Sequence, residues 1–83
     1  MRIPRVSGEV RRELDRLGLE LMREGNGRED PIYVRIDGLP IGHAFDRGEM
    51  GWLVYANHQK LGPTVAFPTF DSAVRAILQR AQW

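Results

Sequence analysis

The chain has 83 residues, a formal net charge of +1 and no cysteine. A chain of this length forms one domain, and without cysteine it can hold neither a disulfide framework nor a cysteine zinc site. Hydrophobic residues make up 42% of the chain and charged residues 28%, which excludes wholesale disorder.

The first predicted element is a helix that starts after Ser7 and runs to the turn at residues 25–27. The hydroxyl of Ser7 can cap a helix N-terminus, and the Gly-Asn-Gly sequence at 25–27 can end one. Between them, four apolar residues recur at spacings of four, three and four: Val10, Leu14, Leu17 and Leu21. This spacing predicts one buried helical stripe.

A run of strands is expected after the first helix. Residues 32–36 alternate between apolar and polar side chains, which is typical of a half-buried strand. We expect a hairpin loop at 37–40, because Asp-Gly is a turn signal, and a second strand at 41–45. Residues 52–57 are rich in aromatic and β-branched side chains and predict a third strand. Residues 63–67 are a candidate fourth strand, in which Pro63 would have to lie on an edge or be the first residue of the strand.

The last predicted element is a helix over residues 70–81. Thr69 follows Pro68 and can cap its N-terminus, and Asp71 falls in the first turn, where the helix dipole favours an acid. Its apolar residues lie on one helical face: Phe70, Ala73, Val74, Ile77, Leu78 and Ala81. The predicted class is therefore α+β: residues 1–83 form one domain of helix, three- or four-stranded antiparallel β-meander and helix, with both helices on one sheet face.

The stretch GHAFDRGEMGW, residues 42–52, concentrates polar groups that invite a catalytic interpretation. Residues 46–51 fall in a predicted solvated turn, where a charged group lacks the burial or fixed neighbour that general acid–base catalysis needs. His43 would share a strand face with Ile41 and Phe45, which favours a core or boundary histidine with one ring nitrogen hydrogen-bonded. The other histidine, His58, lies two predicted strands away. We therefore expect no catalytic, cofactor-binding or metal-binding residues and no enzymatic activity.

A sheet with both helices on one side leaves its other face uncovered, and such a face is expected to be a contact surface. In the strand at 52–57, either Trp52, Val54 and Ala56 or Leu53 and Tyr55 would point outward, and the sequence leaves this choice open. The expected partner-binding residues are Tyr33, Arg35, Trp52, Tyr55 and Lys60. Tyrosine, tryptophan and arginine dominate contact energies between proteins.

These observations favour a non-enzymatic regulator or inhibitor that binds a protein partner through its sheet face or a strand edge. Small inhibitors from phages and mobile elements, including the anti-CRISPR type, belong to this class. The same surface would also serve a homodimer. The N-terminus lacks the apolar segment of a signal peptide, and no apolar run reaches the roughly 20 residues that cross a bilayer, so a cytoplasmic protein without membrane contact is expected.

The alternative function is nucleic-acid binding. The predicted order of helix, three strands and helix resembles that of the double-stranded-RNA-binding domain, and Tyr33, Trp52 or Tyr55 could stack on bases. That family has a basic cluster at the start of its last helix, whereas this chain has Asp71 there. The resemblance is therefore one of element order alone, and protein binding is the favoured expectation.

Overall fold

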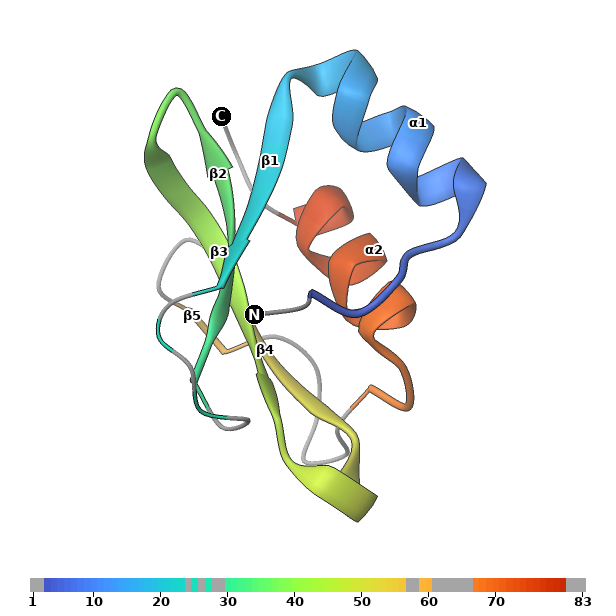
Figure 1. Cartoon of the computed structure of the whole chain (residues 1–83), viewed down its shortest axis with the longest axis vertical. Helices are drawn as coiled ribbons and strands as arrows, with labels where there is room; N and C mark the ends of the chain where they lie inside the picture. The colour runs from blue at the N-terminus through green and yellow to red at the C-terminus, as the bar shows by residue number, and fades with distance from the viewer. Residues whose placement is uncertain are drawn as a thin grey trace.

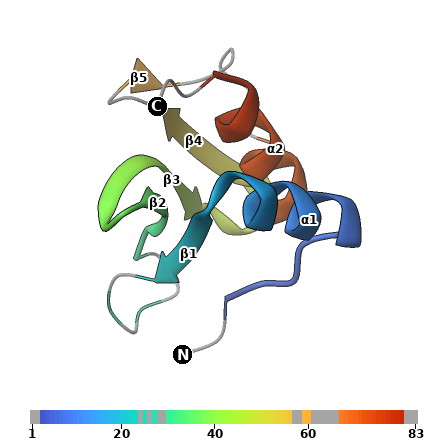
Figure 2. The same ribbon diagram turned by 90° about the horizontal axis from the view of Figure 1, so that it is seen from above.

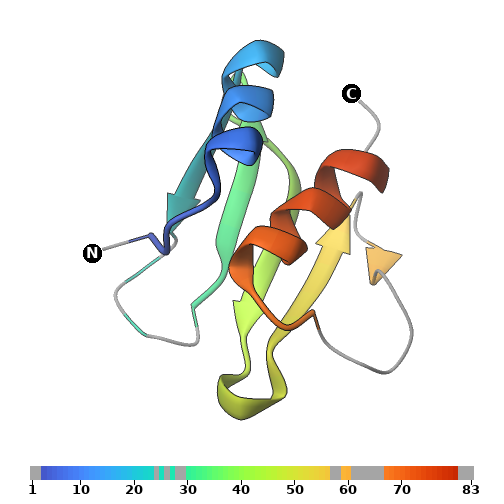
Figure 3. The same ribbon diagram turned by 90° about the vertical axis from the view of Figure 1, so that its right-hand side faces the viewer.

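The computed structural model describes residues 3–23, 25, 27, 30–56, 59–60 and 67–80, with the backbone alone at 59–60. Helices α1 (Gly8–Leu17) and α2 (Phe70–Arg80) pack on one face of a single antiparallel sheet (Figures 1 and 3). The strands follow one another across the sheet in chain order: β1 (Leu19–Arg23), β2 (Ile32–Ile36), β3 (Leu39–Asp46), β4 (Trp52–Ala56) and β5 (Gln59–Lys60). The predicted α+β class, with a helix at each end of an antiparallel meander, is confirmed.

The first helix is shorter than predicted, because residues 19–23 form strand β1. Ser7 caps α1 as expected, its Oγ accepting a hydrogen bond from the Val10 backbone N–H at 3.2 Å. The helix ends at Gly18, whose φ of 71° lies in the left-handed region that favours glycine. Leu21, expected on the helical stripe, instead pairs with Val34 of β2.

The connection between β2 and β3 is also shorter than predicted. Asp37 and Gly38 have φ angles of 51° and 80°, and the ladder resumes at once with Ile36 opposite Leu39. Two successive residues with positive φ suit a tight hairpin, because their twist matches that of the flanking strands. Leu39 and Pro40, expected in the loop, therefore belong to β3.

An irregularity in the β2–β3 ladder changes the direction of the side chains in β3. Val34 pairs with Gly42 but the next residue, Arg35, pairs with Pro40, so Ile41 is an extra residue in β3. Such a bulge breaks the strict alternation of side chains. Ile41 is buried in the core, and the prediction that it shares a face with His43 is wrong.

The core lies between the sheet and the two helices. α1 packs over β1, and α2 packs over β3 and β4. The buried cluster comprises Val10, Leu14, Leu19, Ile32, Val34, Ile41, Ala44, Val54, Phe70, Ala73, Val74 and Ile77. Val54 and Ala56 are both buried, so the face of β4 that the sequence left undecided is settled.

The end of the predicted stripe in the last helix and most of the candidate fourth strand cannot be compared with the structure. Ala81 and residues 63–66 lie outside the described residues. Phe67, at the end of the 63–67 segment, forms an isolated antiparallel bridge with Trp52. Thr69 caps α2 as expected, with its Oγ1 accepting from the Ser72 backbone N–H at 3.1 Å. No helix in the described part of the chain is long and apolar enough to cross a membrane.

Replacing Ile77 with alanine tests the packing of α2 on the sheet. Ile77 is fully buried in the described structure, so we expect Ile77→Ala to lower the free energy of unfolding by about 2–4 kcal/mol, measured by urea denaturation. Gln79→Ala, at an exposed position of the same helix, is the matched control and should change stability by less than about 0.5 kcal/mol. Equal effects of the two variants would show that α2 does not pack on the sheet through Ile77.

Gly42 offers a second test, because an added Cβ there would lie 2.7 Å from Ile77 Cγ2 and 2.8 Å from the Tyr55 carbonyl oxygen. We expect Gly42→Ala to lower the free energy of unfolding by about 1–3 kcal/mol, as overpacked cores do. In the control Gly8→Ala, the nearest atom to the new Cβ is a terminal nitrogen of Arg12 at 3.8 Å, and stability should not fall. A neutral Gly42→Ala would contradict the close approach of α2 to β3.

Candidate functional site

The face of the sheet that points away from both helices carries large side chains. Because Val34, Ala44 and Val54 face the core, their strand neighbours face the opposite side. Figure 2 shows both helices lying on one side of the sheet. We call this opposite surface the outer face, and it comprises Glu20, Met22, Tyr33, Arg35, His43, Phe45, Leu53 and Tyr55.

One row of residues crosses the sheet at the centre of the outer face. Met22 is opposite Tyr33, Tyr33 is opposite His43, and His43 is opposite Tyr55. In β5, the residue opposite Tyr55 is Lys60. Each of the five described strands thus contributes one position to this central row. All side chains of the row that are described are at least partly exposed, Met22 at 40%.

The rings of the outer face pack against one another. The His43 ring lies 5.2 Å from that of Tyr33, 5.1 Å from that of Phe45 and 4.9 Å from that of Tyr55, between ring centres. The His43 and Tyr55 rings are nearly parallel, at 10°, whereas Phe45 meets each of them edge-on. These are favoured aromatic geometries, and the parallel pair covers one ring face of each partner.

Arg35 lies beside the central row and is fixed by neutral acceptors. Its Nε and Nη2 donate to the Gly38 carbonyl oxygen at 3.2 and 2.7 Å, and its Nη1 contacts the sulfur of Met22. None of the ion pairs in the described part of the chain includes Arg35. Glu20, the residue opposite Arg35 in the β1–β2 ladder, is exposed and is not in a described ion pair with Arg35.

The structure brings together three of the five residues expected to bind a partner. Tyr33, Arg35 and Tyr55 lie on the outer face, and Lys60 occupies the position opposite Tyr55. Trp52 lies apart from them, because its ring packs against Phe70 of α2 at 5.0 Å, on the core side of the sheet. Its backbone also exchanges two hydrogen bonds with Phe67, at 2.7 and 2.8 Å.

Five further residues of the outer face are not among those that the sequence predicts to bind a partner: Glu20, Met22, His43, Phe45 and Leu53. Met22 falls in the segment predicted as helix, although Gly18, four residues before Met22, is a signal for an earlier helix end. His43 is predicted as a boundary residue and not as part of a contact surface. His43 and Phe45 are two positions apart in β3, and Leu53 and Tyr55 are two positions apart in β4, so each pair lies on one strand face. Once the core side of the sheet is known, both pairs are seen to point outward.

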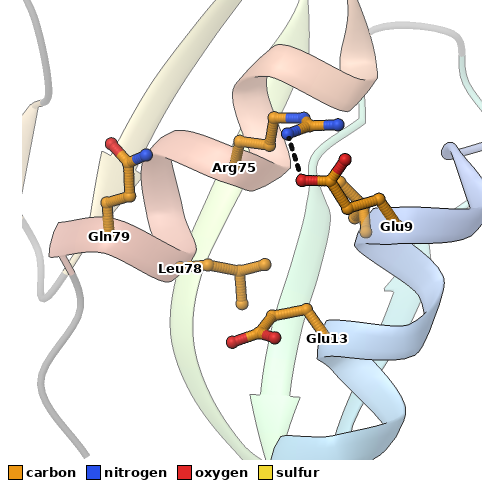
Figure 4. Close-up of a pocket in the computed structure, with 6 residues that line it drawn as sticks. Glu9, Glu13, Arg75, Leu78 and Gln79 are labelled. Carbon is orange, nitrogen blue, oxygen red and sulfur yellow. Dashed lines mark hydrogen bonds and ion pairs between the residues drawn. The ribbon is translucent and has the colours of Figure 1, made fainter.

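A shallow groove between the two helices is a second candidate site (Figure 4). It has a volume of about 230 Å³ and is lined by Glu9, Val10, Glu13, Arg75, Leu78 and Gln79. Arg75 spans it, with Nη1 donating to Glu9 Oε1 at 3.1 Å and Nε donating to Asp71 Oδ2 at 2.8 Å. Asp71 Oδ1 in turn accepts from the Ser7 backbone N–H at 2.7 Å. These charges hold the two helix N-termini together, so the groove is part of the scaffold.

Hydrogen bonds from Arg75 and from the Ser7 backbone lower the pKa of Asp71. The folded-state pKa of Asp71 therefore lies below its unfolded value. The contribution of Asp71 to the free energy of unfolding is present above a pH of about 4 and is lost as the pH falls through the lowered pKa. We expect Asp71→Asn to lower stability at pH 7 by about 1 kcal/mol and to flatten the loss of stability below pH 4. Urea denaturation at pH 7 and pH 3 measures both effects.

The control for this test is Glu49→Gln, which removes one carboxylate from the exposed 3-10 turn Gly48–Met50. It should keep the stability and the acid sensitivity of the parent chain. If Asp71→Asn unfolds with the same pH dependence as the parent, the link between Asp71 and Arg75 does not stabilise the fold.

No family model, no curated protein and no solved structure matches the chain in our comparisons. Among the described residues, no group of three or more histidine, aspartate or glutamate side chains is placed to hold a metal ion. We therefore infer function from the chemistry of the outer face.

Proposed function

We propose that the protein binds a protein partner through its outer face and acts as a small regulator or inhibitor without catalytic activity of its own. The observation that carries this proposal is the central row, in which Tyr33, His43 and Tyr55 lie side by side on the face away from both helices. Phe45 and Leu53 extend the row with apolar surface, and neither belongs to the buried core. Contiguous apolar surface of this kind usually marks a contact site.

The composition of the face also fits protein binding. Tyrosine and arginine are enriched among the residues that dominate contact energies, and Tyr33, Arg35 and Tyr55 provide them here. The molecule measures 31 × 28 × 23 Å along its principal axes. A face within these dimensions is on the order of one standard protein interface, roughly 800 Å² per partner.

Nucleic-acid binding is the second candidate, because aromatic rings beside an arginine can stack on bases. Two observations make it the weaker one. The ring faces that would receive a base are partly used within the protein, since His43 and Tyr55 stack on each other. In addition, β1 follows α1, so the chain does not have the order of helix, three strands and helix that the double-stranded-RNA-binding domain has.

The class of inhibitor and its location are parts of the same proposal. A compact chain that blocks a target by contact needs no chemistry of its own, and this suits the small inhibitors of phages and mobile elements, including the anti-CRISPR type. The absence of cysteine fits a reducing compartment, so we place the protein in the cytoplasm. A homodimer through the outer face is the competing arrangement.

Affinity capture with matched variants tests the proposal. The intact chain, Phe45→Ser and Tyr55→Ser are compared with Arg11→Ser, which alters an exposed residue of α1 on the other side of the molecule. Each immobilised variant, with its fold verified by circular dichroism, is incubated with nuclease-treated lysate of the source organism. We expect both outer-face variants to reduce capture of a specific protein by at least tenfold and Arg11→Ser to leave it unchanged.

Each other outcome contradicts part of the proposal. Equal capture by the parent and the outer-face variants would exclude the outer face as the contact. Capture that occurs only in a parallel sample of untreated lysate, together with nucleic-acid affinity that falls steeply with salt, would favour the second candidate. A dimer in sedimentation equilibrium that Phe45→Ser converts to a monomer would show that the partner is a second copy of the chain.

A further inference from the structure

The guanidinium of Arg35 keeps hydrogen-bonding capacity that the fold does not use. An arginine side chain has five N–H donors in a fixed planar arrangement. Two of these donate to the Gly38 carbonyl oxygen, and one faces the sulfur of Met22. Two donors therefore remain, one on each terminal nitrogen. Terminal nitrogens that each keep a donor can bind the two oxygens of a carboxylate.

The same contacts fix the guanidinium in place before any partner arrives. Gly38 belongs to a two-residue turn in which its own φ is 80° and that of Asp37 is 51°, so the accepting carbonyl is part of a tight hairpin. Met22, from the neighbouring edge strand β1, contacts Nη1 on the other side of the group. A side chain ordered in this way loses less entropy on binding than a free arginine does.

No ion pair in the described part of the chain includes Arg35, although the exposed Glu20 is its cross-strand neighbour on the outer face. The two arginines that take part in described ion pairs are neutralised nearby, Arg16 by Glu13 and Arg75 by Glu9 and Asp71. Arg35, by contrast, contacts neutral atoms alone among the described residues, and the backbone places a second cationic residue, Lys60, at the far end of the central row. The guanidinium of Arg35 itself is therefore complementary to a negatively charged group.

Resting on the proposed function, we propose that the outer face recognises an acidic segment of its protein partner. A carboxylate of that segment is received by the two remaining donors of Arg35, and an adjacent apolar side chain lies against Tyr33 and Met22. Arginine is suited to this role because its planar donors bind a carboxylate at two points, which a lysine cannot do. The partner is thus distinguished by an aspartate or glutamate, or a C-terminal carboxylate, next to an apolar residue.

Peptide selection tests this inference even though the partner is unidentified. A library of random 12-residue peptides is selected on the immobilised full-length chain, and the affinities of enriched peptides are measured by fluorescence polarisation. We expect enrichment of aspartate or glutamate beside apolar residues. Arg35→Gln should weaken binding of these peptides at least tenfold, Arg35→Lys should restore part of the loss, and Arg12→Gln, on the exposed side of α1, should have no effect.

A charge exchange separates recognition from stability. A peptide whose selected acid is replaced with lysine should no longer bind the parent chain. The same lysine peptide should bind the Arg35→Glu variant. A loss of hairpin stability alone cannot produce this second result. Peptides that carry no acid, bind Arg35→Gln normally and lose affinity with Phe45→Ser would overturn this inference and leave the proposed function intact. Peptides unaffected by Phe45→Ser and Tyr55→Ser, or a selection without enrichment, would overturn both.

Discussion

The contact of Ile77 with Gly42 determines which side of the sheet becomes the outer face. Gly42 has no side chain, which allows α2 to approach β3 closely. A Cβ added at Gly42 would lie only 2.7 Å from Ile77 Cγ2. Once Gly42 faces the helix, its partners Val34 and Ala56 face it as well. The next residue of β3, His43, must then point away. The position of the central row on the outer face therefore follows from the packing of α2 against β3.

Local sequence pattern is sufficient for the elements whose periodicity is unambiguous. The last helix is predicted from a stripe that includes Phe70 and Ile77, and strand β2 from strict alternation. The prediction for the segment 19–23 is wrong because Leu21 continues the spacing of the α1 stripe, whereas the segment is stabilised as β1 by pairing with β2, the next strand along the chain. Tertiary pairing overrides a local helical pattern in such cases.

The candidate site is predictable to the extent that it depends on alternation alone. Tyr33 and Arg35 are placed correctly because β2 itself alternates without interruption, the extra residue of the β2–β3 ladder being Ile41 in β3. Trp52 is misplaced because its side of β4 depends on contact with Phe70, which is 18 positions later in the chain. The prediction that Ile41 shares a face with His43 is wrong because Ile41 is an extra residue in β3, and this bulge breaks the alternation between the two.

The two sides of the molecule use their charges differently, and this difference supports a binding role for the outer face. On the helix side, Arg75 is joined to Glu9 and Asp71, so its charge contributes to holding the two helices together. On the outer face, Arg35 is positioned by a backbone carbonyl and a methionine, which orient the group without neutralising it. A chain of 83 residues with two helices covers one face of its sheet, and the aromatic rings and the arginine of the other face remain accessible. The donors of Arg35 that make no hydrogen bond within the described part of the fold, and the partly exposed rings beside it, are therefore available to bind a partner.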